Sequence, residues 1–423
     1  MERIELYPGI ALNYQEETRF KTEYLSLNLL CPPELFDRAH GTLLGAVLPM
    51  GSEKHPTSDR LERALLELYG ASLYTHGSSI GETFIQPFSL SFHSDRYLPK
   101  GESASEKAYS LLFDCMFSPY LERGAFKKEY VEHQKRNKLA LLKAEKDNKP
   151  AYAVKKCLQR LCEGEPIAYP QTRLEQDIRK VTPRSLYAYH QRLLKSAPVE
   201  IFYFGPQSQK SIVEMLLANL KPLFYPKLPL QKDVASPVKQ TLVRQTESIN
   251  AGQSILCMGF KTPILRGDRR YIAFMLMREM LCDAPVSLIF THVREKLGLC
   301  YFCSSFTLSR KGVYLLSSGI EAKHAVVTEK AILAQIERVK DGDFSEDLLN
   351  ACKRSLCNAL WEMSDSPVST EGWYLRSILS SEEQTPAELR KKICAVTRKE
   401  ISEAAQSLVP DSFFLLEGRR GRK

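Results

Sequence analysis

The sequence predicts an α+β protein made of two homologous domains, each an antiparallel sheet covered by helices on one face. At 423 residues the chain is too long for one ordinary core, because domains usually hold about 100–200 residues. A stretch with several prolines, residues 223–240, predicts a linker between an N-terminal domain, 1–222, and a C-terminal domain, 241–423. The two halves also repeat the same order of elements.

Three landmarks recur at nearly constant spacing in the two halves. Each half has an amphipathic helix that ends near a glycine, then a pair of strand-like runs, then a Phe-Ser dipeptide before a helix. Gly70 and Gly298 lie 228 residues apart, and the Phe-Ser dipeptides at 117–118 and 344–345 lie 227 residues apart. Because all three landmarks keep register, we infer an internal duplication of one α+β unit.

The expected elements follow the same order in both halves. In the first half they are a helix at 60–73, a strand pair at 74–94 and a helix at 105–117. In the second half they are a helix at 286–299, a strand pair at 300–322 and a helix at 324–340. Apolar and polar residues alternate in the strand runs, which predicts sheets with one buried face, and an apolar stripe on each helix would cover that face. Two such domains joined by a long linker would form a clamshell.

Composition predicts a cytoplasmic protein without membrane or nucleic-acid partners. The N-terminus lacks the basic and apolar regions of a signal peptide, and the most apolar short run, 271–277, is far below the ~18 residues of a membrane span. Eleven cysteines without framework spacing favour a reducing compartment. The net charge of +9 is modest, and the most basic stretch, 135–157, also carries acidic residues, so we interpret it as a solvated helix face.

The run REKLGLCYFCSSF, which begins at Arg294, combines two possible chemistries. If the run from residue 299 onward is a strand, Cys300 and Cys303 point to opposite faces, so this CxxC predicts sheet packing rather than a zinc or redox site. Arg294 lies on the last turn of the preceding helix, and Gly298 supplies its tight end. This order can bring the Arg294 guanidinium and the Tyr301 phenol toward one spot.

The same run resembles the R-x(6)-Y element in the C-terminal half of M16 (pitrilysin or insulinase-like) metallopeptidases. The duplicated architecture, the linker and the run after residue 312 are also similar to that family, so the resemblance covers nearly the whole chain. It implies the M16/LuxS-like clamshell fold, in which the second domain presents the arginine and the tyrosine to the substrate. By this resemblance Arg294 and Tyr301 are substrate-binding residues.

The resemblance also locates the family's zinc motif, H-x-x-E-H, and shows that it is degenerate here. Counting back from Gly51, the five motif positions hold Thr42, Leu43, Leu44, Gly45 and Ala46. Both histidine ligands, at positions 42 and 46, and the glutamate base, at 45, are therefore replaced. The helix that carries the family's third ligand, a glutamate, places about Arg136 at that position. We expect no metal and no catalytic residue in this chain.

A relocated metal site is the alternative that the sequence leaves open. EYVEH at 129–133 places Glu129 and His133 on one helix face beside Glu132, in an order similar to the zinc motif. No second helix offers the missing ligand, and His40 lies on another helix face two residues before the expected site. An exposed helix with glutamate and histidine at this spacing is common, so we favour an ordinary helix.

A family member without zinc ligands but with Arg294 and Tyr301 resembles the non-catalytic subunit of two-chain M16 peptidases. The resemblance implies a partner subunit that supplies zinc and H-x-x-E-H, a peptide substrate, and a metalloendopeptidase that is inactive without the partner. A homodimer is possible where the partner is absent. A purely structural scaffold and a peptide-binding accessory without a role in cleavage remain open.

A finer resemblance points to one bacterial group within the family. LERALLELYGASLYTHGSSIGE, with the intact Arg and Tyr element, is similar to the zinc-less member of paired Gram-positive M16 proteins. That group is associated with the 5-aminopentanol modification of elongation factor P.

Overall fold

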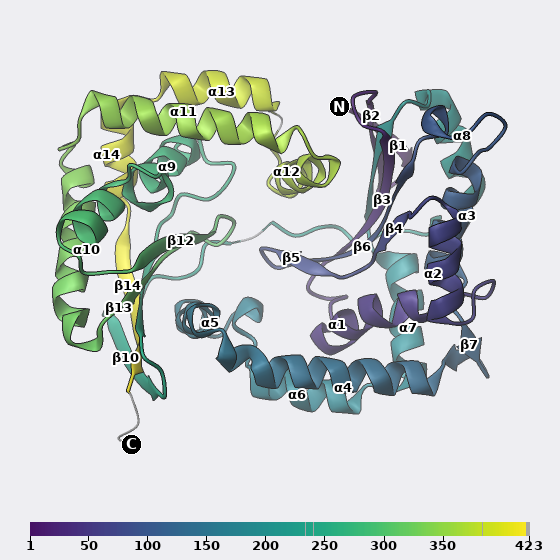
Figure 1. The fold of residues 1–423 in the computed structure, drawn as a ribbon, viewed down its shortest axis with the longest axis horizontal. Helices are drawn as coiled ribbons and strands as arrows, with labels where there is room; N and C mark the ends of the chain where they lie inside the picture. The colour runs from purple at the N-terminus through teal and green to yellow at the C-terminus, as the bar shows by residue number, and fades with distance from the viewer. Residues whose placement is uncertain (233, 240, 383, 420–423) are drawn as a thin grey trace. The chain divides into compact units, whose positions relative to one another are not determined.

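The computed structural model describes residues 1–232, 234–239, 241–382 and 384–419. It divides into two compact units (Figure 1), and we describe each by itself. Unit 1 holds residues 1–143 and 170–231, and unit 2 holds 144–169 and 232–423. The predicted α+β class is confirmed, because each unit is a sheet packed against helices.

The described units do not follow the predicted domain boundaries everywhere. The change at residues 231 and 232 lies within the predicted linker, 223–240, of which residues 233 and 240 lie outside the described residues. Residues 144–169, which the prediction placed in the N-terminal domain, belong to unit 2. Sequence patterns could not show that residues 144–169 belong to unit 2, because the pattern of an amphipathic helix does not reveal which sheet the helix covers.

Unit 1, all of whose residues the structure describes, contains a seven-stranded sheet of order β1-β2-β9-β3-β6-β4, with β5 also paired to β6. Its strands are β1 Glu2–Tyr7, β2 Ile10–Glu16, β3 Thr22–Cys31, β4 Ser72–Tyr74, β5 Ser78–Ile80, β6 Thr83–His93 and β9 Val199–Gly205. A small hairpin joins β7 Leu121–Glu122 to β8 Ala125–Phe126.

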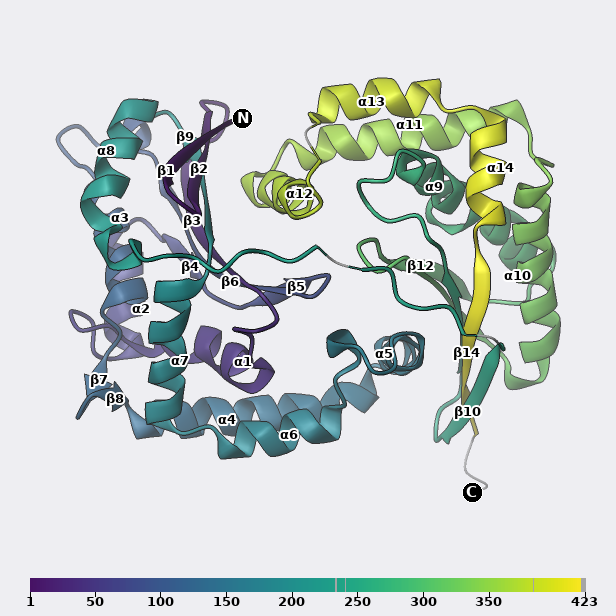
Figure 2. The ribbon, with the colours of Figure 1, turned by 180° about the vertical axis from the view of Figure 1, so that it is seen from behind.

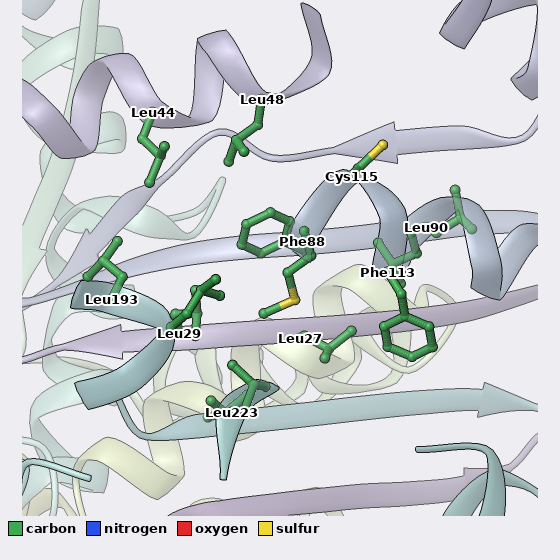
Figure 3. Packing of buried hydrophobic residues seen from close by; sticks show 14 of the residues in the cluster. Leu27, Leu29, Leu44, Leu48, Phe88, Leu90, Phe113, Cys115, Leu193 and Leu223 are labelled. Carbon is green, nitrogen blue, oxygen red and sulfur yellow. The ribbon is translucent and has the colours of Figure 1, made fainter. Parts of the chain in front are cut away.

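The helices of unit 1 are α1 Arg38–Val47, α2 Ser58–Glu67, α3 Ser105–Phe117, α4 Lys128–Ala144, α6 Gln171–Lys180, α7 Pro183–Ser196 and α8 Gln209–Asn219. Alternate residues of the strands form one apolar face, and α1, α3 and α7 cover it. Figure 3 shows this core from close by, with Leu27, Leu29 and Phe88 from the strands beside Leu44 and Leu193 from the helices.

The described part of unit 2 contains a five-stranded sheet of order β10-β14-β11-β13-β12. Its strands are β10 Val243–Ile249, β11 Ser254–Lys261, β12 Phe302–Leu308, β13 Val313–Ile320 and β14 Val409–Gly418. Its α-helices are α5 Lys149–Leu161, α9 Tyr271–Arg278, α10 Ala325–Lys340, α11 Glu346–Met363, α12 Pro367–Leu379, α13 Pro386–Ala395 and α14 Arg398–Gln406. Two π-helical segments, η6 Glu279–Asp283 and η7 Ile289–Lys296, follow α9.

The strand orders of the two sheets repeat each other, as an internal duplication predicts. In each unit, a strand that comes late in the sequence lies between two strands that come early. Strand β9 lies between β2 and β3, and β14 lies between β10 and β11. Both sheets are mainly antiparallel, but β2 pairs with β9 and β10 with β14 in parallel. The prediction of purely antiparallel sheets missed these pairs. Strands that are distant in sequence, with helices between them, can pair in either direction.

Helix α5 covers the second face of the sheet in unit 2. Its buried residues Tyr152, Cys157 and Leu161 pack on an apolar patch of strand residues: Ile255, Cys257, Val313, Leu315, Phe414 and Leu416. Polar contacts fix the same segment, since the Tyr152 hydroxyl donates to Glu247 at 2.7 Å. The interpretation of residues 135–157 as a solvated helix face is therefore wrong for α5.

In the described residues, none of the helices is both long enough and apolar enough to cross a membrane. The predicted cytoplasmic location stays a prediction.

Candidate functional site

The degenerate zinc motif, residues 42–46, lies on α1 of unit 1. The helix begins where the Asp37 side chain accepts a hydrogen bond from the His40 backbone N–H, at 3.0 Å. Leu43 and Leu44 are fully buried, and Figure 3 shows the Leu44 side chain directed toward the strands of the core. These two motif positions therefore serve packing.

Gly45, at the position of the family's glutamate base, is closed by a neighbouring backbone segment. A Cβ atom at Gly45 would lie 2.3 Å from the carbonyl oxygen of Thr75, far inside van der Waals contact. The Thr75 hydroxyl donates to the Gly45 carbonyl at 2.6 Å, and Gln86 donates to the Thr75 carbonyl at 2.5 Å. This hydrogen-bonded segment occupies the space that any larger side chain at position 45 would need.

Helix α4, where the resemblance places the family's third zinc ligand, is held by a lysine. Arg136, the residue expected at the ligand position, is exposed. Its neighbour Lys135 is buried, and its ammonium donates to the Glu132 carboxylate and to the carbonyls of Arg179 and Val181, each at 3.0 Å. Lys135 thus ties the end of α6 to α4.

The alternative site at EYVEH is also committed to other contacts. The His133 ring lies 3.0 Å from the Asn137 amide, and Glu129 lies 3.2 Å from the Lys127 ammonium. No group of three or more histidine, cysteine, aspartate or glutamate side chains that could hold a metal ion occurs in the described part of the chain. The residues at both candidate positions therefore do not fit a zinc ion.

Arg294 and Tyr301 lie on one short segment of unit 2, as the sequence suggested. Arg294 is on η7, which is π-helical where the prediction expected an ordinary helix, and its exposed guanidinium lies over the Phe290 ring at 4.7 Å. Gly298, with a φ of +62° and open space at its Cβ position, turns the chain toward β12. This φ lies in the left-handed region, which favours glycine.

Tyr301 comes directly before β12 and is 59% exposed. Its hydroxyl donates to Glu321 at 3.3 Å, and its backbone N–H donates to the Gly319 carbonyl at 2.8 Å. Lys323, and to a smaller extent Tyr301, lower the pKa of the Glu321 carboxyl. The side chains of Arg294 and Tyr301 thus contact different partners, and both are open to a further ligand.

The cysteines of the CxxC do not lie as the sequence predicted. The strand begins at Phe302, after Cys300, and both Cys300 and Cys303 join the apolar cluster on the helix-covered face of the sheet. The expectation of opposite faces is therefore wrong. Cys303 instead meets Cys282, with the sulfur atoms 3.4 Å apart. No sequence signal pointed to this pair, because the two residues are far apart and one lies on a π-helix.

Comparison with known proteins agrees with this geometry. Residues 180–356, which include Arg294 and Tyr301, match the family described as "Peptidase M16 inactive domain". A protein of Bacillus subtilis (strain 168), named "Probable inactive metalloprotease YmfF", is 26% identical over 98% of this chain and 97% of its own length. These matches support an M16-like protein that resembles inactive members of the family.

Solved structures extend this likeness over the whole length of the chain. A conserved protein from Enterococcus faecalis V583 is 25% identical, with a TM-score of 0.89 over 100% of this chain and 99% of its own. A peptidase M16 inactive domain from Pseudomonas fluorescens is 18% identical, with a TM-score of 0.81 over the same shares of the two chains, and shows likeness of fold. The expectation of a degenerate zinc motif at residues 42–46 is in line with the names of these relatives.

Proposed function

We propose that this M16-like protein is the non-catalytic subunit of a two-chain zinc peptidase. The observation that carries the proposal is the closed position at Gly45, where the Thr75 carbonyl excludes a side chain. A protein in which only the zinc-binding and base residues had been substituted would still have space for side chains at these positions. Unit 2, in contrast, keeps Arg294 and Tyr301 in exposed positions.

In this proposal the two subunits divide the chemistry. The partner supplies the zinc ion, its activated water and the general base. Arg294 supplies a fixed cation with several N–H donors, and Tyr301 supplies a phenolic donor, both directed at carbonyl oxygens of the bound peptide. Such donors are worth roughly 3 kcal/mol each where they stabilise a developing oxyanion. The peptide would add as a strand to a sheet edge of the partner.

The test is a peptidase assay on this chain, on a zinc-bearing M16 partner and on their mixture. We expect cleavage by the mixture and none by this chain alone. In the mixture, Arg294→Ala or Tyr301→Phe should lower kcat/KM about 100-fold, as expected from the loss of one such donor. Zinc-dependent cleavage by this chain alone would contradict a non-catalytic role.

Matched variants separate a role in the site from a general effect of charge or ring chemistry. Arg354→Ala removes an exposed arginine from α11, and Tyr97→Phe removes the hydroxyl of a tyrosine that is 47% exposed in unit 1. Both should leave cleavage by the mixture unchanged. Unchanged rates for the Arg294 and Tyr301 variants as well would refute the role of these two residues.

Two other functions remain open as proposals. A scaffold would assemble with its partners even when Arg294 and Tyr301 are both replaced. A peptide-binding accessory would bind peptides, lose that binding with the same variants, and not increase cleavage by any partner. A neighbouring gene for an M16 chain with intact H-x-x-E-H would favour the two-chain peptidase. We extend the proposal to the elongation factor P pathway, where deletion of this chain should change the mass of that factor's modification.

A further inference from the structure

Two thiols of unit 2 that have no assigned role lie where two of its elements meet. One element is π-helical, and the other is an edge strand of the sheet. Cys282 is on η6, the π-helical continuation of α9, and Cys303 is on β12, which pairs only with β13 among the described strands. Figures 1 and 2 show α9 and β12 in this unit, and η6, which continues α9, contacts β12 through Cys282 and Cys303. Single π-helical turns often occur at functional sites, and edge strands open locally more easily than central ones.

The two sulfur atoms lie close together at the edge of the apolar cluster, and a serine hydroxyl contacts one of them. They are 3.4 Å apart, with the Cys282 thiol donating to Cys303, and the Ser318 hydroxyl donates to the Cys303 sulfur at 3.3 Å. These two hydrogen bonds, Cys282 first, lower the pKa of Cys303, and the contact with Cys303 together with burial raises that of Cys282. Cys303 is therefore the better thiolate and Cys282 the thiol beside it.

A second set of contacts holds η6 against β12 at the same place. The Ser305 hydroxyl donates to Asp283 at 2.5 Å, and the Arg278 guanidinium donates to Asp283 at 2.8 Å. Because Asp283 follows Cys282 and Ser305 lies two residues after Cys303, these contacts keep the thiols opposite each other. Two other buried cysteines lie nearby: Cys300, three residues before Cys303, and Cys257, which faces the other side of the sheet, where its thiol lies 3.7 Å from the Ser317 hydroxyl.

We propose that Cys282 and Cys303 are an oxidisable dithiol that forms a disulfide with a hydroperoxide as oxidant. The Cys303 thiolate attacks the peroxide O–O bond, which gives a sulfenic acid at Cys303 and releases hydroxide, with hydrogen peroxide as the simplest case. The Cys282 sulfur then attacks the Cys303 sulfur and displaces the hydroxyl group as water. The net reaction converts two thiols and one hydrogen peroxide into one disulfide and two waters. The bond would fix η6 to the beginning of β12, close to Tyr301. This inference does not depend on the proposed peptidase role.

The test is peptide mapping of the full chain after reaction with hydrogen peroxide. The reduced protein is oxidised, its free thiols are blocked with iodoacetamide in denaturant, and the digest is analysed without reduction by mass spectrometry. We expect a peptide pair linked through Cys282 and Cys303. Blocking of both thiols, while other cysteines such as Cys394 are oxidised, would overturn the proposal. A link between Cys300 and Cys303 would do the same.

Single substitutions assign the order of the steps. In Cys282→Ser the sulfenic acid at Cys303 has no thiol to displace its hydroxyl group, so dimedone should label Cys303. In Cys303→Ser, Cys282 should stay reduced. Cys352→Ser, at a buried cysteine on α11, should leave the disulfide unchanged. Equal dimedone labelling of wild type and Cys282→Ser would show that Cys282 does not take part.

Two neighbouring serines on β13 provide a matched pair for the role of the hydroxyl donor. Ser318→Ala removes the donor to Cys303 and should slow disulfide formation several-fold, with a rise in the pH at which the rate is half-maximal. Ser317→Ala removes a hydroxyl on the opposite face, near Cys257, and should leave the rate unchanged. Equal rates in both variants would refute activation of Cys303 by Ser318.

Discussion

Gly45, where the sequence places the glutamate base of the family's zinc motif, has no room for a side chain. The Thr75 carbonyl lies 2.3 Å from the position of a Cβ atom, and the Thr75 hydroxyl bonds to the Gly45 backbone. We therefore expect Gly45→Ala to lower the free energy of unfolding by about 1–3 kcal/mol, as overpacking of a well-filled site does. Urea denaturation followed by circular dichroism measures this change.

Gly372 offers the control, because it is also a helical glycine but has room. The nearest atoms to its Cβ position belong to the end of the Arg376 side chain, at 3.6 Å. Gly372→Ala should stabilise α12 by about 0.5–1 kcal/mol, since alanine loses less backbone entropy than glycine in a helix. A stable Gly45→Ala variant would show that the segment at Thr75 moves aside easily. Zinc binding would then be measured on a variant that carries Thr42→His, Gly45→Glu and Ala46→His together.

His190 makes the stability of unit 1 depend on pH. It lies on α7, fully buried between the rings of Phe126 and Tyr187, and loss of hydration lowers its pKa to about 4. The unfolded chain binds a proton near pH 6.5, so stability is lost as the pH falls from about 6.5 to about 4. Between pH 7 and pH 5 we expect a loss of about 2 kcal/mol from this group. Urea denaturation at the two pH values measures it.

Two variants isolate the contribution of His190. His190→Phe keeps a ring of similar shape that does not titrate, so it should remove this part of the pH dependence. His133→Gln replaces an exposed histidine on α4 and should leave the dependence as in wild type. The same loss of stability in His190→Phe as in wild type would assign the effect to other groups.

At the scale of single elements, regular helices with clear amphipathic patterns were predictable and irregular ones were not. The helix expected at 105–117 is α3 Ser105–Phe117, and the one expected at 324–340 is α10 Ala325–Lys340. The helix expected at 286–299 is the shorter π-helical η7, Ile289–Lys296. An apolar stripe reports the buried face of a helix but hardly distinguishes its hydrogen-bond pattern, which depends on contacts distant in sequence.

Helix α5 shows the same limit for packing partners. Its apolar face was visible in the sequence, but the sheet that it covers lies in unit 2. Leu161 is almost fully buried there, and Gly259 of β11 is so close that a Cβ atom would lie 2.5 Å from the Leu161 side chain. We expect Leu161→Ala to lower the free energy of unfolding of unit 2 by about 2–5 kcal/mol. Thermal denaturation followed by circular dichroism measures this loss.

Leu141 is the control for this substitution. It lies on α4 and is 64% exposed. Leu141→Ala should change the free energy of unfolding by less than about 0.5 kcal/mol, as is usual for surface positions. Similar losses in the two variants would mean that burial of α5 on the sheet contributes little.

At the scale of the whole molecule, the duplication was predictable because its landmarks are local. The assignment of residues 144–169 to unit 2 was not predictable. The two glycines follow helix ends, which neighbouring residues determine. The Phe-Ser dipeptides differ: Ser345 caps the start of α11, as predicted, whereas Phe117 ends α3 and the next helix, α4, begins only at Lys128.

The assignment of α5 to unit 2 depends on the shape of an apolar patch that forms only after the sheet has folded. The degenerate motif at Thr42 and Ala46 stays a prediction from the sequence, while the closure of Gly45 by Thr75 required the structure.

The position of residues 144–169 in unit 2 leads to a prediction about fragments of the chain. Residues 232–423 alone leave the patch formed by Ile255, Leu315, Phe414 and neighbouring residues uncovered, so we expect this fragment to self-associate in light scattering and bind a hydrophobic dye. A fragment in which residues 144–169 precede 232–423 through a flexible linker should be monodisperse, because α5 again covers the patch. Leu161→Asp in that fragment places a charge at the centre of the contact and should restore self-association. A monodisperse fragment 232–423 with a cooperative thermal transition would show that the sheet is stable without α5, and that residues 144–169 connect the units rather than complete the second one.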